Sequence, residues 1–565
     1  MDLCPKLGIG IPVGKDSLSM QTSWHDGEIE KQVVSPISLV VSAFATVTDA
    51  TKTLTPALSE VADTELVLID LGAGKNRLGG SALAQVFSAL GGVAPDVDDA
   101  ELLKKYFAVV RKLARAGLIL AYHDRSDGGL LATAVEMMFA ARRGITLYLD
   151  ELTFAARETD VDDYDSTPDT QRLGLNSGVL SALFAEELGA VVQIRRSDRA
   201  VVMAAFREQR LGAVTHVVGH PNETDELRVI RTAKPLVVAS RTNLQKAWSK
   251  TSYMIQALRD NPATSSEEYA HIENLNDTGL FSRLRFDVST TSAPDSQSKA
   301  GQPKVAILRE QGVNGQVEMA HAFVKAGFRA IDVHMSDIIE GRVSLADFRG
   351  LAACGGFSYG DVLGAGEGWA KSILFNARAR EEFARFFART DSFAIGVCNG
   401  CQMMSNLAEI IPGAENWPHF ERNRSEQYEA RTVMLEIRES PSIFFTGMAG
   451  SVIPVPTAHG EGRAVFRDQA QAEAARWTCA AQFVDYAGVA TEKYPANPNG
   501  SPQGMTAFTT PDGRFTIMMP HPERAALAAN LSWRPDDWCL VDEAAGTPAP
   551  SPWMRMFENA RRWVG

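Results

Sequence analysis

The chain has 565 residues, of which 45% are hydrophobic and 22% charged, and its formal net charge is −13. This length exceeds what one hydrophobic core serves, so about two to four domains are expected. The acidic balance argues against a general nucleic-acid or anionic-membrane surface, and no apolar run approaches the roughly 20 residues that span a bilayer. Six scattered cysteines form no disulfide framework and no signal-peptide core opens the sequence, so a cytoplasmic protein is predicted.

Composition divides the sequence near residue 303. The stretch 287–303 is rich in Ser, Thr, Pro and Ala and lacks apolar periodicity, which predicts a linker between a domain at 1–286 and a domain at 304–565. A second stretch, 157–177, is acidic and polar and predicts a surface loop.

The first region mixes strand and helix patterns. Apolar runs at 35–47 and 64–72 predict strands, and apolar positions repeating every three to four residues predict helices at 100–117 and 128–144. Gly117 is expected to end the first of these helices. The first region is therefore expected to alternate strands with helices.

The second region alternates regularly. Apolar runs at 304–310, 330–335, 351–356 and 393–397 predict strands, with a helix around 315–327. This rhythm predicts a mostly parallel, doubly wound α/β sheet, in which chemistry collects at the carboxyl ends of the strands.

Cys398 is the candidate nucleophile. It follows the apolar run ending at Val397, precedes a helix-forming segment, and has Gly396 and Gly400 as small neighbours. A cysteine at a tight strand-to-helix turn is exposed to substrate, and the helix N–H groups favour its reactive thiolate.

Nucleophilic attack by a thiolate also needs a base, a group that orients the base, and oxyanion donors. His521 and Glu523 follow an apolar strand in MMPHPER (518–524). If that segment is extended, alternation points both side chains the same way, so that Glu523 holds the His521 ring. Gly355 and Gly356 follow another strand and are expected to form a loop for oxyanion donors.

The pair Cys398 and Cys401 also matches the C-x-x-C pattern of redox and zinc sites. No second Cys or Cys/His pair stands close by to complete a zinc site. A redox or regulatory protein stays open as an alternative, although the helical spacing predicts that Cys401 is a buried helix residue.

The motifs GVCNGCQ (396–402) and PHPE (520–523) resemble those of the class I glutamine amidotransferases. More narrowly, the chain resembles the phosphoribosylformylglycinamidine synthase family, through motifs at 354–376, 396–407, 457–463 and 494–502 and through IPVGKDSLSM, HDRSDGGL and LFAEELGAVVQI in the first half. The resemblance implies an AIR-synthetase-like α+β module, the second half of the synthetase, followed by a class I glutaminase domain.

In HDRSDGGL, Asp124 matches a Mg²⁺ ligand of the family and Ser126 a contact to the nucleotide, ATP. From the residues alone, Ser126 or Asp127 can equally cap the following helix. The GKDS segment (14–17) fails the phosphate-loop spacing. The roles of Lys15, Glu186 and Glu187 stay open, and the two glutamates can also be solvated loop carboxylates.

The resemblance implies that Cys398, His521 and Glu523 hydrolyse glutamine. The ammonia would serve the ATP-dependent conversion of formylglycinamide ribonucleotide to its amidine in purine biosynthesis. Long members of the family carry further chain before this point, including the first synthetase half, so this chain alone is expected to act as a glutaminase only. An amidotransferase for another nucleotide acceptor is the main alternative enzyme.

Overall fold

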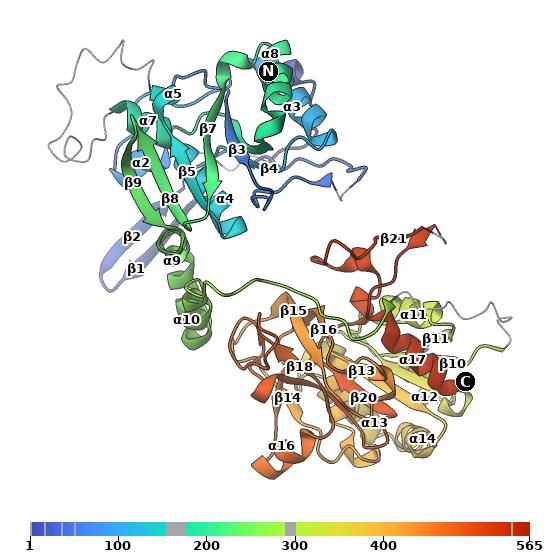
Figure 1. Ribbon diagram of the computed structural model, residues 1–565. Coiled ribbons are helices and arrows are strands. Elements are labelled where there is room, and N and C mark those ends of the chain that lie inside the picture. The colour runs from blue at the N-terminus through green and yellow to red at the C-terminus, as the bar shows by residue number, and fades with distance from the viewer. Residues whose placement is uncertain are drawn as a thin grey trace. The chain divides into compact units, whose positions relative to one another are not determined.

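The computed structural model describes residues 3–15, 18–35, 38–49, 52–153, 177–288, 301–543 and 546–565. All but the last residue of the predicted surface loop, and most of the predicted linker, therefore lie outside the described residues. The chain forms two compact units, residues 1–248 and 249–565, and their boundary falls within helix α9 (Arg241–Arg259) (Figure 1). Across the described ranges, no helix combines the length and apolar character that crossing a membrane requires.

A seven-stranded sheet forms the core of the first unit. All neighbouring strands in it are antiparallel except β5 and β8. In sheet order the strands are β4 (Ala121–Asp124), β6 (Gly189–Arg195), β3 (Thr64–Asp70), β7 (Thr215–Asn222), β5 (Gly144–Tyr148), β8 (Glu226–Arg231) and β9 (Lys234–Ser240).

Strand β3 is buried along its whole length because helices cover both faces of the sheet. Its side chains alternate: Leu66 and Leu68 join one apolar cluster, with helices α4 (Gly129–Ala141) and α7 (Ser177–Phe184). Val67 and Ile69 join the opposite cluster, with α3 (Ala100–Arg115) and α8 (Arg199–Glu208). The predicted strand at 64–72 and both predicted helices are confirmed.

The ends of helix α3 follow local capping chemistry. The Asp99 side chain accepts hydrogen bonds from the N–H groups of Glu101 and Leu102, which have no partners inside the helix. At the other end Gly117 has a φ of +67°, a left-handed conformation that stops helices at little cost for glycine. Gly117 therefore ends the helix as predicted.

The prediction of a strand at 35–47 is wrong. Residues 38–49 form no strand, and their apolar side chains are exposed, with Phe44 at 96%. The preceding hairpin of β1 (Gln21–Asp26) and β2 (Ile29–Val34) is exposed as well. An apolar run becomes a strand only where a neighbouring strand pairs its backbone and a core buries one face, and the described residues supply neither here.

The second unit contains a nine-stranded mixed sheet. Its first five strands are parallel and its last four join antiparallel. In sheet order they are β11 (Arg329–His334), β10 (Lys304–Arg309), β12 (Gly350–Ala353), β13 (Phe393–Val397), β20 (Phe515–Met518), β19 (Met505–Thr509), β18 (Cys479–Val484), β15 (Glu429–Ile437) and β16 (Val452–His459). The predicted parallel α/β arrangement is thus confirmed for one half of the sheet.

Helices cover both faces of this sheet too. Ala394 of β13 is in register with Phe515 of β20, so Phe393 and Phe515 point to opposite faces. Phe393 packs on Phe323 of α11 (Gln316–Lys325) and on Trp563 of α17 (Met554–Val564). Phe515 packs on Phe387 of α14 (Ala377–Ala388).

Residues that precede β10, the first of this sheet's parallel strands in the chain, also belong to the second unit. Helix α10 (Pro262–His271) begins at Asn261, whose N–H donates to the Ser425 carbonyl at 3.1 Å. The Glu267 carboxylate accepts from the Tyr494 N–H at 2.9 Å and from the Arg424 guanidinium. These contacts attach α10 to the loops that contain Arg424, Ser425 and Tyr494.

Candidate active site

Cys398 occupies the turn between β13 and helix α15 (Asn399–Ser405), as predicted. Its backbone has φ 53° and ψ −111°. Residues other than glycine rarely adopt this conformation, and where they do it is often at functional sites. A Cβ atom on Gly400 would stand 2.0 Å from the Ala353 carbonyl oxygen. Glycine therefore lets α15 pack against β12 and hold the turn in place.

The two cysteines of the turn have different surroundings. Cys398 is 5% exposed, and its Sγ donates to the Ala458 carbonyl oxygen at 3.5 Å. Cys401 is fully buried in α15, and burial raises the pKa of its thiol well above the usual value. Both are free thiols. Cys401 is thus the buried helix residue that the spacing predicted.

His521 and Glu523 form the predicted pair, but for a different structural reason. The His521 Nδ1 and Glu523 Oε1 atoms are 2.6 Å apart, and both side chains are buried. The segment is not extended: Pro522 has φ −66° and ψ −30°, and Glu523 begins a 3₁₀ turn (Glu523–Ala525). The turn, rather than strand alternation, brings the two side chains together.

The surroundings of His521 favour its charged form. Burial opposes the charge, but the Glu523 carboxylate and the negative charge on Cys398 outweigh it and raise the pKa of His521 to about 9. Because Nδ1 faces Glu523, the buried Nε2 is the atom left to serve Cys398. The arrangement holds an imidazolium beside a nucleophilic sulfur, which is the chemistry of an acyl-transfer site.

Gly355 lies close to both His521 and Cys398. A Cβ atom at this position would lie 2.7 Å from His521 Cε1 and 3.3 Å from Cys398 Cβ. Its carbonyl oxygen accepts from the N–H groups of Asn314 and Gly315 at 3.1 and 3.0 Å. The predicted close-approach loop therefore lies beside the nucleophile.

A polar network that the sequence did not predict surrounds the turn at Cys398. The Asn399 side chain donates to Asp361 at 3.0 Å and to Gln402 at 3.1 Å. Its oxygen accepts from the Ser358 N–H at 3.1 Å. Burial raises the pKa of Asp361. The sequence signal for this network was the glycine-rich motif at 354–376, whose turns place Asp361 next to α15.

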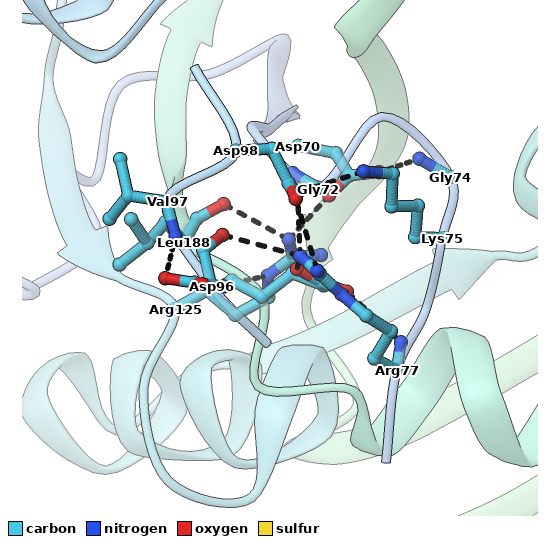
Figure 2. Close-up of polar contacts among 11 residues, drawn as sticks. Asp70, Gly72, Gly74, Lys75, Arg77, Asp96, Val97, Asp98, Arg125 and Leu188 are labelled. Carbon is cyan, nitrogen blue, oxygen red and sulfur yellow. Dashed lines mark hydrogen bonds and ion pairs between the residues drawn. The ribbon is translucent and has the colours of Figure 1, made fainter. Parts of the chain in front are cut away.

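In the first unit, the segment HDRSDGGL ends strand β4 and leads into α4. Asp124, Ser126 and Asp127 are exposed, whereas Arg125 between them is buried. Figure 2 shows Arg125 bound to the Asp70 carboxylate and to the Leu188 carbonyl, and its Nε also donates to the Glu187 carbonyl at 2.7 Å. This buried anchor determines where the neighbouring Asp124 and Ser126 lie.

The two glutamates that were left open have structural partners. Glu187 is fully buried and pairs with Arg77 at 2.7 Å, which in turn reaches Asp98. The Glu186 carboxylate accepts from the N–H groups of Ala82 and Gly128 at 2.8 Å each. Neither residue is therefore a solvated loop carboxylate. Of the GKDS segment, Asp16 and Ser17 lie outside the described residues.

Asp124 belongs to no cluster of metal-binding side chains among the described residues. Within the described ranges, no group of three or more His, Cys, Asp or Glu residues is placed to hold a metal ion. One oxygen of Asp124 accepts a hydrogen bond from the Tyr122 hydroxyl. Mg²⁺ commonly takes one or two carboxylates, with water and substrate phosphates completing its shell, so an exposed Asp124 fits a magnesium–phosphate site of that kind.

Three family models match the chain. Residues 302–564 match the CobB/CobQ-like glutamine amidotransferase domain. Residues 1–46 match the FGAR-AT PurM_N-like domain, and residues 64–231 match the C-terminal domain of AIR synthase related proteins. The amidotransferase match contains Cys398, His521 and Glu523.

Solved structures from Thermotoga maritima resemble parts of the chain. PurLQS is 22% identical over 47% of this chain and 100% of its own, with a TM-score of 0.34. PurL complexed with ATP is 13% identical over 38% of this chain and 28% of its own, and PurL complexed with FGAR is 15% identical over 34% and 30%, each with a TM-score of 0.25. The chain thus spans less than a third of these PurL chains.

The fold of the second unit, its buried Cys–His–Glu set and the family model over 302–564 define a glutamine amidotransferase domain joined to an AIR-synthase-related module. The chain thus combines a glutamine amidotransferase domain with segments similar to the FGAR-AT PurM_N-like domain and to the C-terminal domain of AIR synthase related proteins.

Proposed function

We propose that this chain hydrolyses glutamine at Cys398 and provides the ammonia with which an ATP-dependent C–N ligase converts formylglycinamide ribonucleotide to formylglycinamidine ribonucleotide. The 2.6 Å contact between His521 and Glu523, buried beside a nucleophile on a strained turn, is the observation that carries the proposal. Such a contact keeps the ring oriented and charged.

In the proposed reaction, Cys398 Sγ attacks the side-chain amide carbon of glutamine. Main-chain N–H groups near Cys398 and in the Gly355–Gly356 loop stabilise the oxyanion. His521 gives its proton to the departing nitrogen, which leaves as ammonia. A glutamyl thioester then remains on Cys398. The neutral ring then takes a proton from water, which releases glutamate, while Glu523 stabilises the charged ring.

The first unit would bind the nucleotide. We assign Asp124 to Mg²⁺ and Ser126 to ATP, because both are exposed next to a rigid, buried Arg125. Bound ATP would activate the formyl amide oxygen as a leaving group, and Mg²⁺ would offset the phosphate charge. PurL, which resembles parts of this chain, has been solved in complexes with ATP and with FGAR. A cytoplasmic location fits this pathway.

The synthetase reaction also needs the preceding synthetase portion, in the same chain or as a separate subunit. We expect the present chain alone to release glutamate slowly and to form no amidine. Adding the preceding portion should raise glutamate release and couple it to ATP use. No glutamate release under either condition would contradict the proposal.

Replacing the two cysteines of the turn separately identifies the nucleophile. Cys398→Ala should abolish glutamate release, because Cys398 is the thiol whose charge and hydrogen bond act on His521. Cys401→Ala should leave it largely intact, because Cys401 is a core residue of α15. Loss of activity with Cys401→Ala in a folded protein would favour the redox or regulatory alternative.

A further inference from the structure

A second histidine is buried beside the catalytic set and has no part in the reaction above. His459 ends strand β16 and is 2% exposed. The same strand contacts both catalytic residues, since its Pro456 carbonyl accepts from the His521 N–H at 2.9 Å and its Ala458 carbonyl accepts from Cys398. His459 thus lies on a strand that borders the candidate glutaminase site.

Asn499 determines which ring nitrogen of His459 carries the proton. The Asn499 oxygen accepts from the N–H and the hydroxyl of Ser501, at 3.0 and 2.7 Å. Its nitrogen therefore faces His459 Nε2 at 3.2 Å and the Gly462 carbonyl at 2.8 Å. A carboxamide nitrogen only donates, so Nε2 accepts, and the proton of the neutral ring is on Nδ1.

The ring is also kept neutral. Burial, together with the charge on His521, lowers the pKa of His459 to about 3. A neutral ring does not compete with His521 for the proton that the leaving nitrogen needs. The two histidines, one charged and one neutral, therefore have separate tasks.

The Nδ1–H group of His459 is buried and has no hydrogen-bond partner in the described part of the protein. Buried donors are paired in almost all folded proteins, and an exception at a reactive site calls for a partner that is not protein. Beside a glutaminase site, one such partner is the substrate.

We propose that His459 is a substrate-positioning residue that donates its Nδ1–H to an oxygen of bound glutamine. The inference rests on the proposed glutaminase function. Two oxygens have the required chemistry, the α-carboxylate and the side-chain carbonyl. A donor to the carboxylate acts on binding, whereas a donor to the carbonyl strengthens as negative charge develops during attack.

Two substitutions separate this role from a structural one. In His459→Asn the side-chain amide can place a donor where Nδ1 stands, but it no longer reaches Asn499. In His459→Gln the longer amide reaches Asn499 but leaves the Nδ1 position empty. We expect His459→Asn to stay within about threefold of the unsubstituted chain in kcat/KM for glutamate release, and His459→Gln to lose about tenfold or more.

The measurements use the full chain and include the rate of Cys398 alkylation by iodoacetamide, which needs the thiolate but not the glutamine contact. That rate should be unchanged in both variants. Comparing glutamine with its α-carboxamide analogue identifies the oxygen. A loss confined to glutamine and to KM indicates the carboxylate, and a loss of kcat with both substrates indicates the carbonyl.

Three results would overturn the inference: unchanged kinetics in both variants, recovery by Gln rather than Asn, or slowed alkylation, which would show that His459 supports Cys398 and His521 instead. If the unsubstituted chain releases no glutamate, that result contradicts the proposed function itself, together with this inference.

Discussion

The Nδ1 atom of His521 and the Oε1 atom of Glu523 lie 2.6 Å apart because the chain turns at Pro522 between them. The turn also leaves the opposite ring nitrogen, Nε2, buried on the side of Cys398. A single local bend thus orients His521, the proposed base, favours its charged form and leaves Nε2 on the side of Cys398, the proposed nucleophile.

The pH dependence of glutamate release should report this pair. His521 must be protonated to release ammonia, and its pKa is raised to about 9. We therefore expect kcat/KM to fall as pH rises through about 9. Glu523→Gln removes the largest contribution that raises this pKa, so the alkaline fall should move to lower pH, as a pH–rate profile would show. The exposed Glu473 offers a control, since Glu473→Gln should leave the profile in place.

Gly355→Ala should abolish glutamate release without unfolding the protein. The added methyl group would meet His521 Cε1 at 2.7 Å and Cys398 Cβ at 3.3 Å, so the two side chains must separate. Gly460→Ala is the matched control, because its nearest contact, Tyr428, is an ordinary 3.9 Å away. Steady-state kinetics and thermal melting of both variants test this. Full activity of Gly355→Ala would mean that the site is looser than the structure shows.

His459 should make the second unit less stable in acid. The pKa of this buried ring is lowered to about 3, while an unfolded histidine takes up a proton below about 6.5. Between these values the unfolded state binds more protons, so stability falls as the pH falls. In urea unfolding from pH 6.5 to 4.5, His459→Asn should lose less stability than the unsubstituted chain. Parallel losses would contradict the buried, neutral ring.

The buried ion pair of Arg125 and Asp70 should stabilise the first unit. Arg125→Met leaves the Asp70 carboxylate buried without its charge partner, which typically costs about 3–5 kcal/mol. The exposed pair of Lys104 and Glu101 provides the comparison, and Lys104→Met should cost about 0–1 kcal/mol. Thermal melting of the two variants tests the difference. Equal melting temperatures would show that Asp70 is satisfied by the N–H groups of Gly72 and Gly74.

The sequence pattern predicted those elements whose signal is local. Apolar runs identified strands such as β3 and β13, and the glycines around Cys398 identified a strand-to-helix turn. The same reasoning failed at 35–47, where an equally apolar run forms no strand over its described part. Strand formation depends on a neighbour's backbone, which no local pattern contains. For that reason the antiparallel half of the second sheet was also missed.

The sequence was enough to propose Cys398, His521 and Glu523 as a set, because their residue types and spacing are themselves the motif. The sequence did not determine their geometry. Strand alternation predicted the contact between His521 and Glu523, but a turn at Pro522 makes it. Only the tertiary structure showed that His459, Asn499 and Asp361 surround the site. Their contacts join segments tens of residues apart, and burial together with the charges that those segments bring near decides which histidine is charged.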